Sequence, residues 1–295
     1  MISEPAFNRL SALLHGPDVS GTRYELLSEL GRGGMGVVYL ARDTVLDREV
    51  ALKIVDIVDG ASGDGAVEKE ARILARLEHP GLVPIHDFGQ LPDGRLFYAM
   101  KRVRGDRLDR WVATGRDLTA RLGVFLRICD AVAFAHANGV IHRDLKPANV
   151  MVGEFGEVLV LDWGVAAAKG DRDLATAVVG TRDYMAPEQL RADAHLDERA
   201  DVYALGAILA ATAADTAALV AVAGKARSAD PAARYPSVPA LAADVSRFLA
   251  GLAVEAHRES VIDRIVRVGR RYRLPILLVL AYLVMRMLLL WMVRV

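Results

Sequence analysis

The sequence predicts an α+β protein with two lobes, one rich in β-strands and one helical, followed by a single apolar helix. Three observations predict this arrangement. Short alternating apolar runs fill residues 23–100, helical patterns dominate from Gly105 onward, and residues 274–293 are almost continuously apolar. The chain therefore divides into an N-terminal extension (1–22), one domain (23–251) made of an N-lobe (23–100) and a C-lobe (101–251), a basic segment (252–273) and the apolar helix (274–293).

The composition is that of a globular protein with an uneven distribution of charge. The chain has 295 residues, of which 53% are hydrophobic, so it can bury a large core. Its 37 basic and 37 acidic side chains cancel, and this balance argues against nucleic acid as a partner. The balance hides a net charge of −6 on residues 1–255 and +6 on residues 256–295. The single cysteine, Cys129, excludes a disulfide framework and a zinc site made of several cysteines.

The N-lobe has the pattern of antiparallel strands interrupted by one helix. Runs such as VVYLAR and EVALKIV are rich in Val, Ile and Tyr, which favour strands. In AVEKEARILARL, the residues Val67, Ala71, Leu74 and Leu77 recur at the spacing of one helix face. We therefore expect a single helix within an otherwise β-rich lobe.

The C-lobe pattern begins with a long helix. In LTARLGVFLRICDAVAFAHANG, apolar residues recur at helical spacing, with Thr119 as the expected N-cap and Gly139 as the expected end. Short strands are expected around residues 141–161, and helices return after Pro187. This order completes the helical second lobe.

The apolar segment is long enough to span a membrane. Residues 274–293 would form about 30 Å of helix, which matches the hydrocarbon core of a bilayer. Arginines crowd the preceding residues, so the positive-inside tendency predicts a single-pass protein of the inner membrane, with its body in the cytoplasm beside anionic lipid. Arg286 costs about 2.5–3.5 kcal/mol at a helix centre but lies near enough to the end to snorkel. A buried helix and a helix lying in the membrane interface are the alternatives.

Two features of the N-lobe suit the binding of phosphates. Gly31, Gly33 and Gly36 are spaced G-x-G-x-x-G, and a strand follows them, whereas a helix follows in a dinucleotide fingerprint. Glycines between two strands let the backbone close over phosphates without a Cβ clash. Lys53 lies on an apolar strand, and Glu70 in the next helix is placed to be its anionic partner.

The most specific run is IHRDLKPANV, residues 141–150. Asp144 can accept a hydroxyl proton, Lys146 can hold a phosphate, and the amide oxygen of Asn149 can ligate magnesium. The later run LVLDWG presents Asp162 after an apolar strand, as a further ligand for a hard cation. A polar loop held by Asn and Asp turns is the alternative, but it would need four separate segments to coincide by chance.

Together these segments resemble the bacterial eukaryotic-type (Hanks-type) serine/threonine protein kinases, over about Arg23 to Gly251. The resemblance implies the two-lobe protein kinase fold and transfer of the γ-phosphate of ATP to Ser or Thr of protein substrates, including the kinase itself. It implies ATP and Mg²⁺ as cofactors, with Mn²⁺ as a substitute.

The resemblance also implies the role of each matched residue. Asp144 would be the catalytic base, and Lys146 would contact the γ-phosphate. Lys53, paired with Glu70, would hold the α- and β-phosphates. The magnesium ligands would be Asn149 and Asp162. With Met100 as gatekeeper and Lys101–Val103 as the hinge, the ATP-binding residues would be Gly31, Gly33, Gly36, Val38, Ala51, Lys53, Met100, Val103 and Met151.

Further C-lobe residues match supporting positions of these kinases. Thr181 in GTRDYMAPE resembles their substrate-pocket threonine. Glu188 would form an ion pair with Arg234, and Asp201 would anchor the catalytic loop.

Regulation by phosphorylation is also implied. Arg143 precedes the catalytic aspartate, a feature that in this family accompanies control by activation-loop phosphorylation. Thr176 is the candidate autophosphorylation site, because a phosphate there could pair with Arg143. A solvated loop threonine is the alternative.

The sequence departs from the family pattern at two places. Trp163 follows the metal-binding aspartate where the family has Phe, and we expect its apolar packing role to survive. Only 24 residues separate Gly206 from Pro231, several dozen fewer than in the family, and a helix that docks substrates falls in this gap. We expect exposed apolar surface there, covered by a partner, the membrane or a second copy in a homodimer.

Two other functions remain open at this point. A catalytically silent nucleotide-binding scaffold would explain the shortened C-lobe, although every catalytic residue type is present. A small-molecule phosphotransferase of similar fold is disfavoured by the GTRDYMAPE segment.

Overall fold

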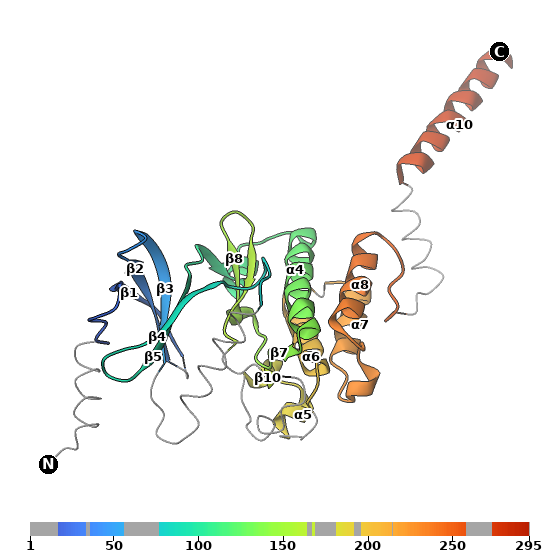
Figure 1. Cartoon of the computed structure of the whole chain (residues 1–295). Coiled ribbons are helices and arrows are strands. Elements are labelled where there is room, and N and C mark those ends of the chain that lie inside the picture. The colour runs from blue at the N-terminus through green and yellow to red at the C-terminus, as the bar shows by residue number, and fades with distance from the viewer. Residues whose placement is uncertain are drawn as a thin grey trace.

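The structure, a computed structural model, confirms the division into a β-rich and a helical lobe (Figure 1). The strands gather at one end of the body and the long helices at the other. The description that follows covers residues 17–33, 36–55, 77–163, 167–168, 181–191, 196–213, 215–257 and 273–294.

The N-lobe is built on one antiparallel sheet. Its strands are β1 (Tyr24–Gly33), β2 (Gly36–Asp43), β3 (Arg48–Ile54), β4 (Ile85–Gln90) and β5 (Leu96–Lys101). They pair in the order β1-β2-β3-β5-β4, which places β3 in the middle. Val50, Leu52 and Ile54 of β3 are fully buried, so this strand is the most firmly held part of the lobe. The expected helix over AVEKEARILARL lies outside the described residues, apart from Leu77.

The C-lobe is mainly helical, with short strands near its junction with the N-lobe. The strands form two small sheets, β6-β8-β9 and β7-β10. The elements in chain order are β6 (Gly105–Arg107), α3 (Leu108–Ala113), α4 (Leu118–Ala137), β7 (Val140–Ile141), the 3₁₀ helix η1 (Pro147–Asn149), β8 (Val150–Gly153), β9 (Val158–Val160), β10 (Ala167–Ala168), η2 (Arg182–Tyr184), α5 (Pro187–Leu190), α6 (Arg199–Thr212), α7 (Ala217–Ala226), η3 (Pro231–Ala233) and α8 (Val238–Leu249).

Helix α4 forms the centre of the C-lobe core, and its start corrects the sequence prediction. The helix begins at Leu118, and the carboxylate of Asp117 accepts a hydrogen bond of 2.7 Å from the N–H of Ala120. The predicted N-cap, Thr119, is therefore wrong, because an aspartate two residues earlier satisfies the free N–H group. At the other end Gly139 has a φ of 76°, the left-handed conformation that commonly follows a helix.

The shortened part of the C-lobe closes by direct contact between α6 and α7. A Cβ placed on Gly206 of α6 would lie 2.6 Å from the Cβ of Ala226 of α7, so the two helices meet at this glycine. The expected broad apolar surface is not found in residues 181–191, 196–213 and 215–257. There the large apolar side chains that remain exposed are Leu190, Val220, Leu249 and Leu252. The missing segment is thus compensated mainly by repacking within the lobe.

The last described element is helix α10 (Arg273–Arg294), which Figure 1 shows clear of both lobes. Its described side chains, from residues 277–288 and Trp291, are all exposed. Among the residues that could be searched, no helix combines the length and the apolarity needed to cross a membrane. The described residues therefore do not support the predicted span over residues 274–293.

The contact at Gly206 gives a stability prediction. Gly206→Ala should lower the free energy of unfolding by about 1–3 kcal/mol, because the added methyl group overpacks the crossing of α6 and α7. The matched control is Gly224→Ala in α7, where a Cβ would meet nothing within 4 Å. That change should be neutral or stabilise by up to about 1 kcal/mol, since alanine favours helix more than glycine does. Urea unfolding of the two variants tests this, and equal stability would contradict the direct contact.

Candidate active site

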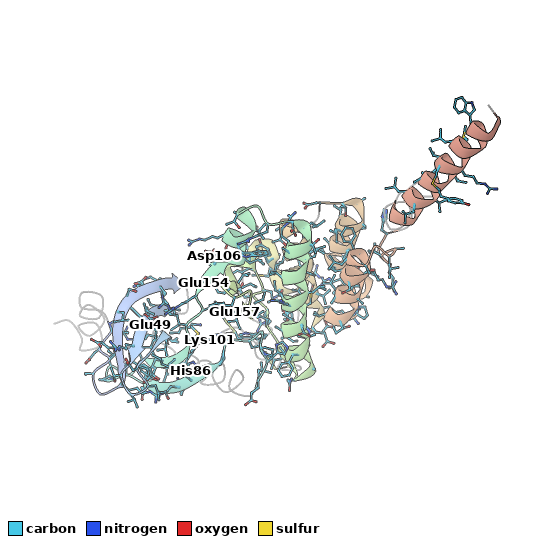
Figure 2. The ribbon with its side chains drawn as sticks, turned by 90° about the horizontal axis from the view of Figure 1, so that it is seen from above. Glu49, His86, Lys101, Asp106, Glu154 and Glu157 are labelled. Atoms are coloured by element: carbon cyan, nitrogen blue, oxygen red, sulfur yellow. The ribbon has the colours of Figure 1, made fainter. Side chains whose placement is uncertain are left out.

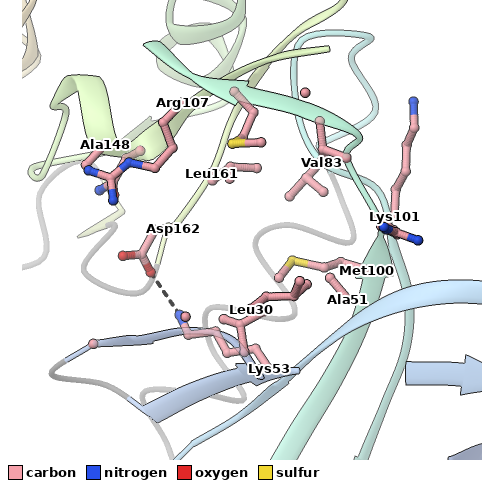
Figure 3. Close-up of a pocket in the computed structure, with 18 of the residues that line it drawn as sticks. Leu30, Ala51, Lys53, Val83, Met100, Lys101, Arg107, Ala148, Leu161 and Asp162 are labelled. Carbon is pink, nitrogen blue, oxygen red and sulfur yellow. Dashed lines mark hydrogen bonds and ion pairs between the residues drawn. The ribbon is translucent and has the colours of Figure 1, made fainter. Parts of the chain in front are cut away.

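A cleft of about 1120 Å³ lies between the two lobes. Its walls come from β1, β2, β3 and β5 above and from the segment 101–110, η1, β8 and Asp162 below (Figure 3). All the residues expected to bind ATP line this one cleft, and so do the expected catalytic and metal-binding residues of the C-lobe. These are Gly31, Gly33, Gly36, Val38, Ala51, Lys53, Met100, Val103 and Met151, together with Asp144, Lys146, Asn149 and Asp162.

The three glycines of the loop have different steric roles. Gly36 has a φ of 128°, and a Cβ there would collide with the carbonyl oxygen of Ile54, so no other residue fits. A Cβ on Gly31 or Gly33 would meet no atom of the other described residues within 4 Å. Their missing side chains therefore leave room for a ligand below the loop.

The apolar part of the cleft suits a flat aromatic ring. Val38 and Ala51 lie on its N-lobe side, and Met151 and Leu161 lie on its C-lobe side. The peptide groups of Val103 make no hydrogen bond to another described residue, which leaves both available at the cleft edge. A purine ring that lies between these walls could form hydrogen bonds with the peptide groups of Val103.

Lys53 and Asp162 join the two lobes across the cleft. The Nζ of Lys53 lies 2.9 Å from Oδ1 of Asp162 (Figure 3), and Lys53 is only 6% exposed. Burial alone would raise the pKa of Asp162, but the charge and hydrogen bond of Lys53 outweigh burial and hold this pKa below its usual value. Asp162 is therefore a carboxylate at neutral pH. The other expected partner of Lys53, Glu70, lies outside the described residues.

The carboxylate of Asp144 is held from three directions. Lys146 donates to its Oδ2 at 2.7 Å, and the Nδ2 group of Asn149 donates to the same oxygen at 3.1 Å. The backbone N–H of Thr181 donates to Oδ1 at 3.0 Å. Lys146 also donates to the hydroxyl of Thr181 at 2.8 Å, so the threonine is tied to the catalytic loop twice. This geometry fixes a basic oxygen atom at the cleft floor.

The loop that carries Asp144 is anchored on buried Asp201. The carboxylate of Asp201 accepts hydrogen bonds from the backbone N–H groups of His142 at 2.8 Å and Arg143 at 2.9 Å, and His136 lies 2.7 Å away. Burial opposes ionisation of Asp201, yet these hydrogen bonds and the nearby histidines lower its pKa. Arg143 has a φ of 71°, a conformation that costs about 1–2 kcal/mol for a residue with a side chain. The two backbone hydrogen bonds hold this strained turn in place.

Trp163 follows Asp162, the expected metal ligand, and is fully buried. Its ring lies 4.4 Å from that of His142, and its Nε1–H donates to the carbonyl oxygen of Val160 at 3.3 Å. A phenylalanine could make the packing contact but not the hydrogen bond. The expected packing role is therefore present, with one additional anchor.

Glu188 and Arg234 form a buried ion pair in the C-lobe. The two guanidinium nitrogens Nη1 and Nη2 of Arg234 lie 2.6 Å and 2.7 Å from the two carboxylate oxygens of Glu188. Arg234 also donates to the carbonyl oxygens of Ser228 and Arg199, each at 2.8 Å. This pair ties the segment after Thr181 to the body of the lobe.

Asn149 and Asp162 can hold a hard cation. The Nδ2 group of Asn149 is occupied by hydrogen bonds to Asp144, which leaves its amide oxygen for a ligand. No cluster of three or more His, Cys, Asp or Glu suited to a metal occurs within the part of the chain that could be searched. One carboxylate and one amide oxygen are the donors that Mg²⁺ uses when phosphates and water complete its shell. The donor set therefore fits this ion.

Several cleft residues were not predicted from the sequence. Leu30 and Leu161 lie next to the predicted Gly31 and Asp162, so adjacency to the motif was the available signal. Tyr98 lies 5.4 Å below the Nζ of Lys53, on the neighbouring strand, which only the strand register reveals. Arg104, Arg107 and Arg110 belong to no motif in the sequence, whereas Lys101 and Arg102 lie in the expected hinge.

Comparisons with known proteins agree with this geometry. A family model described as the protein kinase domain matches residues 24–241. The serine/threonine-protein kinase PknD of Chlamydia caviae is 33% identical, over 78% of this chain and 31% of its own length. The serine/threonine-protein kinase PknB of Mycobacterium tuberculosis is 41% identical, over 65% of this chain and 32% of its own length. The chain thus spans about a third of the length of these relatives. Since the family model covers most of the sequence and the cleft assembles its motifs, the chain belongs to the protein kinase family.

Proposed function

We propose that this kinase transfers the γ-phosphate of ATP to Ser and Thr residues of proteins, itself included, with Mg²⁺ as the metal. One observation carries the proposal: the carboxylate of Asp144 is fixed by three donors in the same cleft that holds the Lys53–Asp162 pair. The names of the relatives, which are serine/threonine kinases, support the choice of acceptor.

The residues of the chain position the two reactants. The adenine would lie between Ala51 and Met151, with its edge at Val103, and the phosphates would extend under the glycine loop toward Lys53. Lys53 would donate to phosphate oxygens, and Asn149 and Asp162 would hold the metal. Bound Mg²⁺ would supply neutralisation of the phosphate charge.

Asp144 would handle the proton of the acceptor. The substrate hydroxyl would donate a hydrogen bond to Asp144 and give up its proton as its oxygen forms the new bond to phosphorus. The bond from phosphorus to the β-phosphate oxygen breaks, and ADP leaves. Lys146, now 2.7 Å from Asp144, is placed to donate to the transferring phosphoryl group.

The alternative of a catalytically silent scaffold has no observation in its favour. The shortened C-lobe suggested this alternative, but in the structure helices α6 and α7 of that lobe pack directly against each other at Gly206. Phosphotransfer by the purified chain, compared with the Asp144→Asn variant, separates the two functions.

The catalytic geometry predicts two inactive but folded variants. Lys53→Ala and Asp144→Asn should each lower phosphotransfer from radiolabelled ATP by at least about a hundredfold, because each removes a group that acts in the transition state. Lys225→Ala is the matched control, since Lys225 also lies over a tyrosine ring, 4.3 Å from that of Tyr235, but outside the cleft. Circular dichroism checks folding. Full activity in either cleft variant would contradict the mechanism.

Thr176 lies outside the described residues and remains the proposed autophosphorylation site. Mass spectrometry of the wild-type chain after incubation with Mg-ATP should find phosphate on Thr176, and the Asp144→Asn variant should carry none. Active enzyme with unmodified Thr176 would contradict this site.

We also propose that the C-terminal segment holds the kinase at a membrane. The support comes from the exposed apolar side chains of α10, such as Leu278, Leu283 and Trp291, which are 71%, 51% and 66% exposed. An exposed apolar surface of this size indicates that another apolar surface covers it. We propose lipid, because the preceding segment is rich in arginine, which binds anionic lipid headgroups. The homodimer that we expected from the sequence was one possible cover for the shortened C-lobe, not for this helix.

Membrane association can be tested by flotation. The full chain should float with vesicles of phosphatidylcholine and phosphatidylserine and resist extraction at alkaline pH. The double variant Leu280→Lys/Val284→Lys should stay unbound, because charges inside α10 cost about 2.5–3.5 kcal/mol each in lipid. Leu252→Lys is the control, since Leu252 is also an exposed leucine but lies before α10. A wild-type chain that stays in solution would contradict the proposal.

A further inference from the structure

We propose that this kinase selects protein segments in which acidic residues flank the phosphorylated Ser or Thr. The inference rests on the proposed function and names the substrate class of the same cleft. It is drawn from the charges that line the cleft mouth, which differ in sign from the rest of the body.

The cleft mouth is basic although the body is acidic. Lys53, Lys146, Asp144 and Asp162 serve the reaction itself. Among the residues that the structure describes, the other charged side chains that line the cleft are six cations and two anions: Arg32, Lys101, Arg102, Arg104, Arg107 and Arg110 against Asp106 and Glu154. The formal net charge of residues 1–255 is −6. Positive charge is therefore concentrated where a substrate has to enter.

Two of these arginines stand beside the catalytic loop. Arg107 ends β6 and Arg110 lies in α3, and both elements pack against η1, the turn that contains Ala148. Figure 3 shows the guanidinium group of Arg107 beside Ala148, on the same side of the cleft as Asp162. Because Ala148 has only a methyl group, it leaves this space open. The two arginines therefore border the path from solvent to Asp144.

Their existing ion pairs leave positive charge for a ligand. Arg107 meets Asp109 at 3.2 Å, with both side chains nearly half exposed, and such exposed pairs are weak. Arg110 forms no ion pair with any described residue. On the far side of the mouth, Arg102 and Arg104 share the single carboxylate of Glu49. A carboxylate of a substrate can replace the present partner of each arginine or form a second ion pair beside it.

The nearby acidic residues do not reverse this sign. Asp106 and Glu154 lie together where β6 pairs with β8 (Figure 2), and the N–H of Glu154 donates to the carbonyl oxygen of Arg104. Asp109 and Asp183 lie near enough to Tyr184 to help raise its pKa, but neither lines the cleft. Glu29, Glu49 and Asp109 pair with four of the arginines at the mouth. Lys101 and Arg110 form no ion pair with a described residue, so the described part of the mouth keeps a net positive charge.

The cleft also has space for part of a peptide beside a nucleotide. Its volume of about 1120 Å³ exceeds the range of about 300–1,000 Å³ that is usual for a small-molecule pocket. The nucleotide phosphates are served by Lys53 and the glycine loop, so Arg107 and Arg110 are not needed for them.

The test compares three peptides that contain one Thr flanked on both sides by Asp, by Gln or by Lys. With the full chain and Mg-ATP, kcat/KM for the Asp peptide should exceed that for the Lys peptide by at least about tenfold, which equals about 1.4 kcal/mol. The difference should lie mainly in KM. It should shrink when salt rises from about 0.1 M to about 1 M, because the Debye length falls from about 10 Å to about 3 Å.

Variants assign the preference to the two arginines. Arg107→Gln/Arg110→Gln should reduce the Asp-to-Lys ratio to about twofold or less, and Arg107→Glu/Arg110→Glu should invert it. The control is Arg247→Gln. Arg247 is 45% exposed like Arg107, and its single ion pair is to Glu255 at 2.9 Å, but it lies on α8 and outside the cleft. This variant should keep the wild-type ratio.

The outcomes separate this inference from the proposed function. Equal use of the three peptides, or a preference that survives charge reversal, overturns the acidic substrate class and leaves the kinase activity standing. If no short peptide is phosphorylated, inhibition of autophosphorylation by poly-aspartate and not by poly-lysine supports the inference, and equal inhibition overturns it. No phosphotransfer of any kind overturns the proposed function and this inference with it.

Discussion

The active site depends above all on one buried carboxylate. Asp201 is 1% exposed, and it accepts the backbone N–H groups of two consecutive residues, His142 and Arg143. An ionised group so deeply buried is unfavourable unless donors surround it, and here the donors belong to the loop that carries Asp144. The same contacts hold Arg143 in its left-handed conformation. The hydrogen bonds thus offset the cost of burying Asp201, and the same bonds fix the position of the loop.

The sequence predicted those parts of the site that local chemistry requires. Gly36 was identified by spacing, and the structure shows that only glycine fits against Ile54. The strand position of Lys53 and the loop position of Asp144 also followed from local pattern. The N-cap of α4 could not be predicted from local pattern, because Thr119 and Asp117 are both good N-cap residues. Only the hydrogen bond from the N–H of Ala120 to Asp117 decides between them. Arg107 and Arg110 were missed for another reason: the role that we propose for them depends on the contact of β6 and α3 with η1, which lies far from both in the chain.

The shortened C-lobe shows how a deletion can be absorbed by packing. The sequence predicted uncovered apolar surface after α6, because the family has additional helix there. Instead α7 buries Leu219, Val222 and Ala226 in the lobe core and meets α6 at Gly206. Glycine permits this approach because it has no side chain between the helices. The lobe therefore keeps a closed core.

Trp163 places a limit on how the site can move. Asp162 has a φ of 60°, so its inward position is a strained one that neighbouring contacts must stabilise. The fully buried Trp163 supplies one such contact, with its ring on His142 and its N–H on Val160. A tryptophan buries about 150–250 Å². At about 25 cal/mol per Å², moving the ring into water would cost about 4–6 kcal/mol. Asp162 is therefore held toward the cleft by packing of its neighbour Trp163 as well as by Lys53.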